Sequence, residues 1–389
     1  MDASSPRDLI VHLQDLPDPR HHNVVHCASN LVVMALVAII ADCDDWEQVA
    51  DFCAHHRYWF EQYLDLPKRG TPSHDTFDRF FGLLDPDAFE AFFQAYTQDL
   101  AGRAPQPGGT CGGLEPLAVD GKCARRSFKD ANRNSAVHLV SAWCGKQGIT
   151  LGQIATDIKS NEITAIPRLL EMLDLRQRLV TIDAAGCQKD IAGLIVNKGG
   201  DYLLQIKANQ PTLLAQAKAG FEEQPIQTTA GESFEDTHGR VESRTLTTIH
   251  AEDAGVDCSA WLGAKTIVRL RSVRVVKGKC HDEDRYYLTS VEPEGLKDAQ
   301  QLLTKCRGHW GIENSLHWVL DVAYREDESR IRMHHGAENA GRLRRLTQNI
   351  IKLGPSPRKK MSIKRKRMAY GRDLDLVMQA LIPSDVTQA

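Results

Sequence analysis

The sequence lacks the features that mark membrane, secreted and zinc-knuckle proteins. Its 10 cysteines are scattered and form no paired Cys-x-x-Cys motif, so we expect reduced thiols rather than disulfides or a structural zinc site. The one candidate membrane segment, residues 31–40, is shorter than the roughly 20 residues that cross a bilayer, and it lies too far along the chain for a signal peptide. It predicts a buried helix. We therefore expect a soluble, cytoplasmic protein with no membrane partner.

The sequence also lacks an excess of positive charge. With a net charge of −3, the chain as a whole does not indicate a nucleic-acid-binding protein. Positive charge is concentrated in residues 358–367, which contain no acidic residue. This run predicts nonspecific contact with a polyanion, and the alternative is a tail that only aids solubility. Its candidate contacts are Lys364, Arg365, Lys366 and Arg367.

The first hundred residues have a helical pattern. Residues 42–63 carry apolar side chains at helical spacing, and Ser73 precedes a further helix as its expected N-cap. Residues 101–113 are rich in glycine and proline, which predicts a linker. We therefore predict a helical N-terminal domain over residues 1–105, in a chain long enough for two or three domains.

After the linker the pattern changes to strands. Three strand-like runs come first, and helices and strands then alternate. This order predicts an α/β domain with a mixed sheet and flanking helices. The predicted strands are residues 114–120, 136–143, 149–156, 179–183 and 202–206.

A long segment then interrupts the alternation. Residues 210–295 contain further β-like runs between polar loops, and residues 296–350 return to a helical pattern. A long insertion costs little closure entropy, so a later helix can return to the sheet. We predict an α/β core over residues 114–352 with a β-rich insertion, followed by a basic C-terminal tail over residues 353–389.

Two aspartates each follow an apolar run that predicts a buried strand. Asp120 follows residues 117–119, and Asp183 follows residues 179–182. A carboxylate at such a place is costly to bury unless it is paired, hydrogen-bonded or metal-bound. The alternatives are an Asp-Gly turn at Asp120 and a helix cap at Asp183.

A third carboxylate lies on a predicted amphipathic helix. Glu313, His317 and Asp321 recur every four residues, which places them on one helix face. The alternative is a solvated face with an incidental histidine. We expect Trp310 and Trp318 to be packing residues rather than platforms for bases.

Two strand-borne carboxylates and one helix-borne carboxylate form a hard, anionic set of oxygen ligands. Such a set suits Mg²⁺ or Mn²⁺ better than zinc, and two such ions can activate a water or a DNA 3′ hydroxyl against a phosphodiester. Nearby basic residues would then contact DNA. Lys122, Arg125 and Arg126 follow Asp120 closely. Arg240 and Arg244 lie in a polar stretch whose alternative is a β-hairpin with a glycine turn.

Together these segments resemble bacterial insertion-sequence transposases of the DDE type, which have an RNase H-like core. The chain is most similar to the branch that includes the H-repeat-associated proteins, and the resemblance covers nearly all of it. The motifs that carry it are Asp18-Pro-Arg20, Trp46-Glu-Gln-Val-Ala-Asp-Phe52, Pro72-Ser-His-Asp-Thr-Phe77, Val119-Asp120-Gly-Lys122, Thr181-Ile-Asp183-Ala-Ala-Gly, His238-Gly-Arg240-Val-Glu242-Ser-Arg244 and His309-Trp-Gly-Ile-Glu313-Asn-Ser-Leu-His317-Trp.

The resemblance implies that Asp120, Asp183 and Glu313 form the metal-binding triad. Asp120 and Asp183 would hold the first of two Mg²⁺ or Mn²⁺ ions, and Glu313 would complete the second. It also implies a β-rich insertion ahead of the glutamate helix.

One part of the family pattern is absent. Related transposases often show Tyr, two residues, Arg, three residues, Glu, six residues, Lys. Here these positions are Cys306, His309, Glu313 and Leu320. We expect His309 or Arg307 to take over the DNA contact, with His317 beside them.

We therefore predict a transposase that binds the terminal inverted repeats of its element, exposes a 3′ hydroxyl by hydrolysis and joins it to target DNA. It would act as a homo-oligomer on DNA, associated with the bacterial nucleoid. One alternative is a metal-dependent nuclease that cuts without joining. The other is a DNA-binding protein derived from a transposase that is no longer catalytic.

Overall fold

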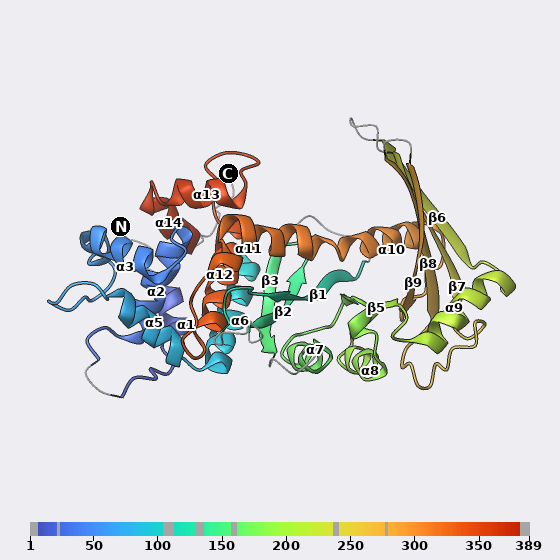
Figure 1. The fold of residues 1–389 in the computed structure, drawn as a ribbon, viewed down its shortest axis with the longest axis horizontal. Coiled ribbons are helices and arrows are strands. Elements are labelled where there is room, and N and C mark those ends of the chain that lie inside the picture. The colour runs from blue at the N-terminus through green and yellow to red at the C-terminus, as the bar shows by residue number, and fades with distance from the viewer. Residues whose placement is uncertain are drawn as a thin grey trace.

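A computed structural model describes residues 7–21, 24–103, 113–128, 136–156, 162–235, 241–276 and 279–381. The molecule is elongated (Figure 1). The N-terminal helices lie at one end, a sheet crosses the middle, and a strand-rich end lies opposite. Within the described ranges, no helix combines the length and the apolar character needed to cross a membrane.

The N-terminal part is helical, as predicted. It forms α1 (Arg7–Leu13), α2 (Ala28–Ile40), α3 (Trp46–His55), α4 (Arg57–Phe60), α5 (His74–Leu83) and α6 (Pro86–Arg103). The apolar run over residues 31–40 lies in α2 and is buried throughout. The helical pattern over residues 42–63 is divided into α3 and α4 at His56. The first helix begins at Trp46 rather than at residue 42. The Asp45 carboxylate caps it there, accepting a hydrogen bond from the Gln48 N–H at 2.8 Å.

The central sheet has the order of an RNase H-like core, which confirms the predicted fold class. β1, β2 and β3 are successive antiparallel neighbours, β4 runs parallel to β1, and β5 runs parallel to β4. These strands are β1 (Glu115–Cys123), β2 (His138–Cys144), β3 (Ile149–Thr156), β4 (Arg178–Ile182) and β5 (Asp201–Ile206).

The insertion is β-rich, as expected, but its strands are not a separate sheet. After α9 (Pro211–Glu223), the chain forms β6 (Thr228–Glu235), β7 (Val241–His250), β8 (Thr266–Val276) and β9 (Lys279–Thr289). β9 pairs antiparallel with β5, so the described strands form one nine-stranded sheet in the order β3-β2-β1-β4-β5-β9-β8-β7-β6.

The two faces of β1 meet different helices, because successive side chains on a strand alternate. Leu117 and Val119 join the core beneath α7 (Glu162–Glu171) and α8 (Lys189–Asn197). Ala118 belongs to the core on the opposite face, with Trp143 and Ile312. α10 (Leu296–Gly308), α11 (Trp318–Ala323) and α12 (Gly336–Leu353) lie on that face (Figure 1). Asp120 follows the alternation of Ala118 and faces these helices.

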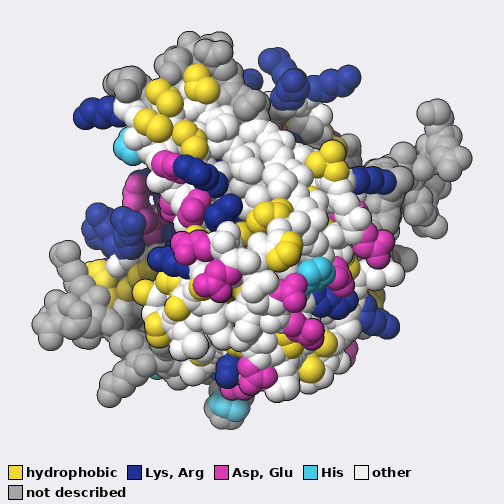
Figure 2. Space-filling view, turned by 90° about the vertical axis from the view of Figure 1, so that its right-hand side faces the viewer, with side chains coloured by type: hydrophobic (Ala, Val, Ile, Leu, Met, Phe, Trp, Pro, Cys, Tyr) yellow, Lys and Arg dark blue, Asp and Glu magenta, His cyan; other side chains and the backbone are white. Residues whose placement is uncertain are grey.

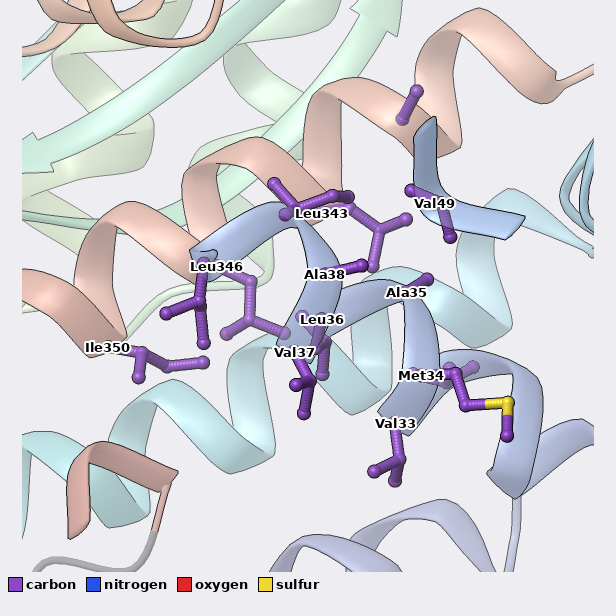
Figure 3. Close-up of a cluster of buried hydrophobic side chains, with 14 of the residues drawn as sticks. Val33, Met34, Ala35, Leu36, Val37, Ala38, Val49, Leu343, Leu346 and Ile350 are labelled. Atoms are coloured by element: carbon purple, nitrogen blue, oxygen red, sulfur yellow. The ribbon is translucent and has the colours of Figure 1, made fainter. Parts of the chain in front are cut away.

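The C-terminal part is folded onto the N-terminal helices. Leu343, Leu346 and Ile350 of α12 pack against the buried side chains of α2 (Figure 3). α13 (Ile363–Tyr370) and α14 (Leu374–Leu381) follow, and the Tyr96 hydroxyl of α6 donates to the Leu381 carbonyl at 2.9 Å. Within the segment expected to be a basic tail, α13 and α14 are therefore packed against this helical core.

Candidate active site

Asp120 lies within β1 rather than at its end, which corrects the sequence-based expectation. It pairs with Ser141, and β1 continues its pairing with β2 as far as Cys123. The Asp-Gly dipeptide therefore forms no turn. The Asp120 side chain is 20% exposed, so its carboxylate opens toward the helices on this face while its backbone stays in the sheet.

Asp183 does follow the end of its strand, as predicted. It begins a short 3₁₀ turn, Ala184–Gly186, and its carboxylate accepts a hydrogen bond from the Ala185 N–H at 3.0 Å. Asp183 therefore also acts as a helix cap, which was the alternative interpretation of this residue. Val119 of β1 is in register with Ile182 of the parallel neighbour β4, so the next residues, Asp120 and Asp183, lie at neighbouring strand positions.

Glu313 begins a π-helical turn, Glu313–His317, which joins the helices on either side of it. α10 and α11 run almost end to end across the sheet (Figure 1), and the π turn lies between them. Glu313 is exposed, while His317 and Asp321 turn inward to β1. Such single-turn π segments inside helices are frequent at functional sites. Helical spacing alone did not predict it.

The pKa of Asp120 is affected by other carboxylates near it. Burial and the charges of Glu162, Asp183 and Glu313 together raise the pKa of Asp120 to about 7, against a hydrogen bond from the Gly121 backbone. Asp183 and Glu313 therefore lie close enough to Asp120 for their charges to act on it. One carboxylate that was not predicted also contributes to this shift.

That additional carboxylate is Glu162, at the start of α7. Its Oε1 atom lies 2.6 Å from the His138 Nε2 atom of β2. A side chain at Gly121 would collide with both residues, since its Cβ atom would come within 2.2 Å of Glu162 and 2.3 Å of His138. The sequence signal was the glycine after Asp120, which clears this space.

His317 faces Asp120 rather than solvent. Its Nδ1 atom lies 3.6 Å from the Asp120 Oδ2 atom, and its side chain is 12% exposed. Burial, with the positive charge of Arg345, lowers the pKa of His317 to about 3. The ring is therefore neutral at neutral pH, and His317, which was predicted to contact DNA, faces Asp120 instead. Its Nε2 atom is buried without a hydrogen-bond partner.

Lys122 is a second correction. Its side chain is only 8% exposed, and its Nζ atom lies 2.7 Å from Asp321 and 3.1 Å from Asp327. Glu326 lies beside it at 3.5 Å and is also paired, at 2.9 Å, with the fully buried Arg345 of α12. Lys122 therefore ties β1 to the end of the glutamate helix instead of reaching a DNA backbone.

The other predicted DNA contacts near the sheet differ in their availability. Arg125 is 80% exposed and pairs with Asp327 at 3.2 Å, and Arg126 is exposed as well. Arg244 pairs with Glu232 and Glu242, and Arg307 also pairs with Glu232. Arg240 lies outside the described residues.

The residues at the positions that depart from the family pattern are buried or hydrogen-bonded within the fold. Cys306 and Leu320 are buried, at 2% and 0% exposure. The His309 Nδ1 atom lies 3.0 Å from the Thr181 hydroxyl of β4, and burial lowers the pKa of His309. His309 therefore anchors the glutamate helix to the strand that carries Asp183.

The basic run at the C-terminus contains both exposed and buried side chains. Lys364 and Arg365 are exposed. Lys366 is 8% exposed and donates to the Ile351 carbonyl at 2.9 Å, and Arg367 is fully buried. The expectation that Lys366 and Arg367 contact DNA is therefore wrong.

The two tryptophans of the glutamate helix are not packing residues. Trp310 is 39% exposed, and Trp318 is 61% exposed. The expectation that they would pack is wrong because the π turn and the helix ends carry them to the outer side of the helix.

The comparisons with known proteins identify the family of this chain. The family model of the transposase DDE domain matches residues 112–350, and that of the DDE_Tnp_1-associated domain matches residues 10–97. The chain belongs to the DDE transposase family.

Its relatives include bacterial transposase-like proteins. The "Putative transposase YncI" of Escherichia coli O157:H7 is 36% identical over 373 residues, covering 94% of this chain and 92% of the relative. The "H repeat-associated putative transposase YhhI" of Escherichia coli K12 is 34% identical over 354 residues, covering 89% and 90%. The "Inactive transposase YbfQ" of the same strain is 34% identical over 74 residues, covering 19% and 87%.

The donor set fits a divalent cation by charge and chemistry. Asp120, Asp183 and Glu313 are oxygen donors, and the repulsion that raises the pKa of Asp120 is the kind that a bound cation relieves. The arrangement is looser than a coordination shell, because among the described residues no three His, Cys, Asp or Glu side chains are gathered tightly enough to hold one ion.

Proposed function

We propose that this chain is an active transposase that cleaves phosphodiester bonds at the ends of its element and transfers the exposed 3′ hydroxyl to target DNA. The observation that supports the proposal is that Asp120 and Asp183 follow the paired residues Val119 and Ile182 of neighbouring strands, with Glu313 near enough for its charge to raise the pKa of Asp120. Membership of the DDE transposase family supports it.

Asp120, Asp183 and Glu313 would hold the Mg²⁺ or Mn²⁺ ions. When bound, two such ions activate the attacking oxygen and stabilise the leaving oxygen of an in-line displacement. The exposed Glu313 leaves one side of the site open to a DNA strand, while Asp120 and Asp183 form its floor on the sheet.

The neighbouring residues would position this set. His317, neutral at neutral pH, faces Asp120 without adding a competing positive charge. Lys122 and Arg345 bind the segment after the helix through Glu326, and His309 binds its beginning to Thr181. Both ends of the glutamate helix are thereby held against the strands that carry the aspartates.

The test is cleavage and strand transfer on DNA that carries the element's terminal repeats. Asp120→Ala, Asp183→Ala and Glu313→Gln should each lower the cleavage rate by on the order of a thousandfold, because loss of one charged group removes transition-state stabilisation. Binding to the same DNA should persist. The control is Glu252→Gln, which neutralises an exposed glutamate in the insertion and should leave the rate unchanged.

The metal dependence gives a second readout of the same experiment. Mg²⁺ or Mn²⁺ should support cleavage, whereas Ca²⁺ should support binding with little turnover. Full activity in a chelator contradicts the metal mechanism. Cleavage without joining of a precleaved 3′ end would identify a nuclease, and specific binding without cleavage would identify an inactive derivative.

A further inference from the structure

A lysine-lined hollow lies immediately beside the glutamate helix. It has a volume of about 550 Å³ and runs between the π turn with α11 on one side and residues 356–366 on the other. Asn314 and Ser315, the two residues after Glu313, line it. None of its lining residues is acidic, although the chain has a net charge of −3. The lysines that line it are Lys352, Lys359, Lys360, Lys364 and Lys366.

Positive charge elsewhere near the site is compensated. A cavity of similar size between α10 and the insertion strands is lined by acidic as well as basic side chains, namely Arg244, Arg274, Arg285 and Arg307 with Glu242 and Glu283. At the insertion end of the molecule, basic and acidic side chains are interspersed (Figure 2). In the described part of the chain, no ion pair joins any of the five lysines of the hollow to a carboxylate. The hollow therefore keeps an unbalanced positive charge.

Trp318 stands in this hollow with most of its surface exposed. It is 61% exposed, and its backbone N–H bonds to the Glu313 carbonyl, so the two residues are one π turn apart. Trp310 differs, because the Arg285 guanidinium lies over its ring at 5.1 Å. Over the described residues, the ring of Trp318 has no aromatic or cationic partner. A large apolar ring exposed among unpaired lysines points to a ligand with both a negative charge and a flat face.

We infer that this hollow binds an unpaired stretch of DNA, with a base stacked on Trp318 and the backbone phosphates held by Lys359, Lys360 and Lys364. Single-stranded DNA offers both features at once, since proteins bind it through a positive groove and aromatic stacking. Duplex DNA offers phosphates, but its bases are stacked internally and would leave Trp318 unused. The inference rests on the proposed function for the source of the DNA, because the hollow begins at Asn314 and Ser315, directly after Glu313.

The first experiment measures equilibrium binding of a fluorescent oligothymidine of about 12 nucleotides, within the site size of single-strand grooves, and of a duplex of equal length. Both are measured in chelator, so that cleavage plays no part. Trp318→Ala should weaken single-strand binding by about tenfold, and Trp318→Phe should recover part of it. The control is Tyr58→Ala, which removes an aromatic ring that is 81% exposed on α4. It should have no effect.

The second experiment removes charge instead of the ring. Changing Lys359, Lys360 and Lys364 together to Gln should lower the slope of log affinity against log salt by about 2 for single strands, since each phosphate contact contributes about 0.7. The matched control changes three exposed lysines outside the hollow, Lys218, Lys265 and Lys297, to Gln. It removes the same charge and should leave the slope nearly unchanged.

Three results would overturn the inference. The first is that Trp318→Ala binds the oligothymidine as tightly as the parent protein. The second is that the hollow's lysines matter only for duplex. The third is that the parent protein fails to bind single strands and Trp318→Ala dissociates a dimer, which would make the hollow a contact between copies. Each can occur while the triad still cleaves DNA, and loss of cleavage with intact Trp318-dependent binding would count against the proposed function alone.

Discussion

At the scale of single residues, the site is dominated by negative charge in a partly buried place. The pKa of Asp120 rises from 3.8 to about 7, first through burial and then through Glu162, Asp183 and Glu313. The folded state without a cation therefore binds a proton more readily than the unfolded chain. Ionisation of Asp120 therefore destabilises the folded state, at the place where the proposed chemistry needs oxygen ligands.

This charge predicts how stability depends on pH. Because the folded pKa of Asp120 is raised, its contribution is fully favourable below about pH 4 and is lost as the pH rises through 7. Asp120→Asn cannot ionise. In chelator it should be more stable than the parent protein at pH 8, by up to about 4 kcal/mol, and the difference should shrink steadily toward pH 5.

Urea unfolding at a series of pH values measures this difference. The exposed Asp284 of β9 provides the control, and Asp284→Asn should show no such trend. A stability difference for Asp120→Asn that is the same at pH 5 and pH 8 would show that Asp120 carries no such charge burden.

At the scale of elements, the glutamate helix is positioned by close contact with the sheet. Gly311 lies two residues before the π segment, and a Cβ atom there would come within 2.7 Å of the Trp143 ring of β2. Trp143 is paired with Ala118, two residues before Asp120. The distance between Glu313 and the aspartates therefore depends on the absence of a side chain at residue 311.

Gly311→Ala should push the helix away from the sheet. We expect a loss of about 1–3 kcal/mol in the free energy of unfolding, as for other overpacked cores, together with a lower cleavage rate. Gly308→Ala is the matched control, since no atom lies within 4 Å of its added Cβ, and it should be neutral or stabilising by up to about 1 kcal/mol. Equal effects of the two substitutions in urea unfolding would rule out this contact as the positioning device.

At the scale of the whole molecule, Arg367 joins three distant parts of the chain. It donates to the Ile39 carbonyl at the end of α2 at 2.8 Å, to the Asp44 carboxylate at 2.9 Å and to the Ala323 carbonyl at the end of α11. Its guanidinium also lies 4.2 Å from the centre of the Tyr324 ring. The N-terminal helices, the glutamate helix and α13 therefore meet at one buried cation.

Arg367→Met should destabilise the protein by about 3–5 kcal/mol, because it leaves buried acceptors and charge without their partner. Arg365→Met, which removes the same charge from an exposed position on the same helix, should change stability by less than about 0.5 kcal/mol. Thermal or urea unfolding compares the two. If Arg367→Met were as stable as Arg365→Met, the three parts would be held together by apolar packing alone.

Much of this protein is determined by local sequence. The positions of strands β1 to β5 along the chain and the buried helix α2 follow from apolar periodicity, and Asp183 follows from its position after a β-branched run. These features depend on near neighbours in the chain, which is why pattern and turn chemistry predict them. The resemblance to DDE transposases added the triad as a set.

Only the tertiary structure decided which charged side chains are exposed and which are buried. Lys122 and Arg367 look in the sequence like the exposed Arg125 and Arg365, yet each is buried among acceptors supplied by residues far away along the chain. The same long-range packing brought the charge of Glu162 near Asp120 and left Trp318 exposed. Burial and ion pairing depend on contacts between distant segments, and no local pattern records them.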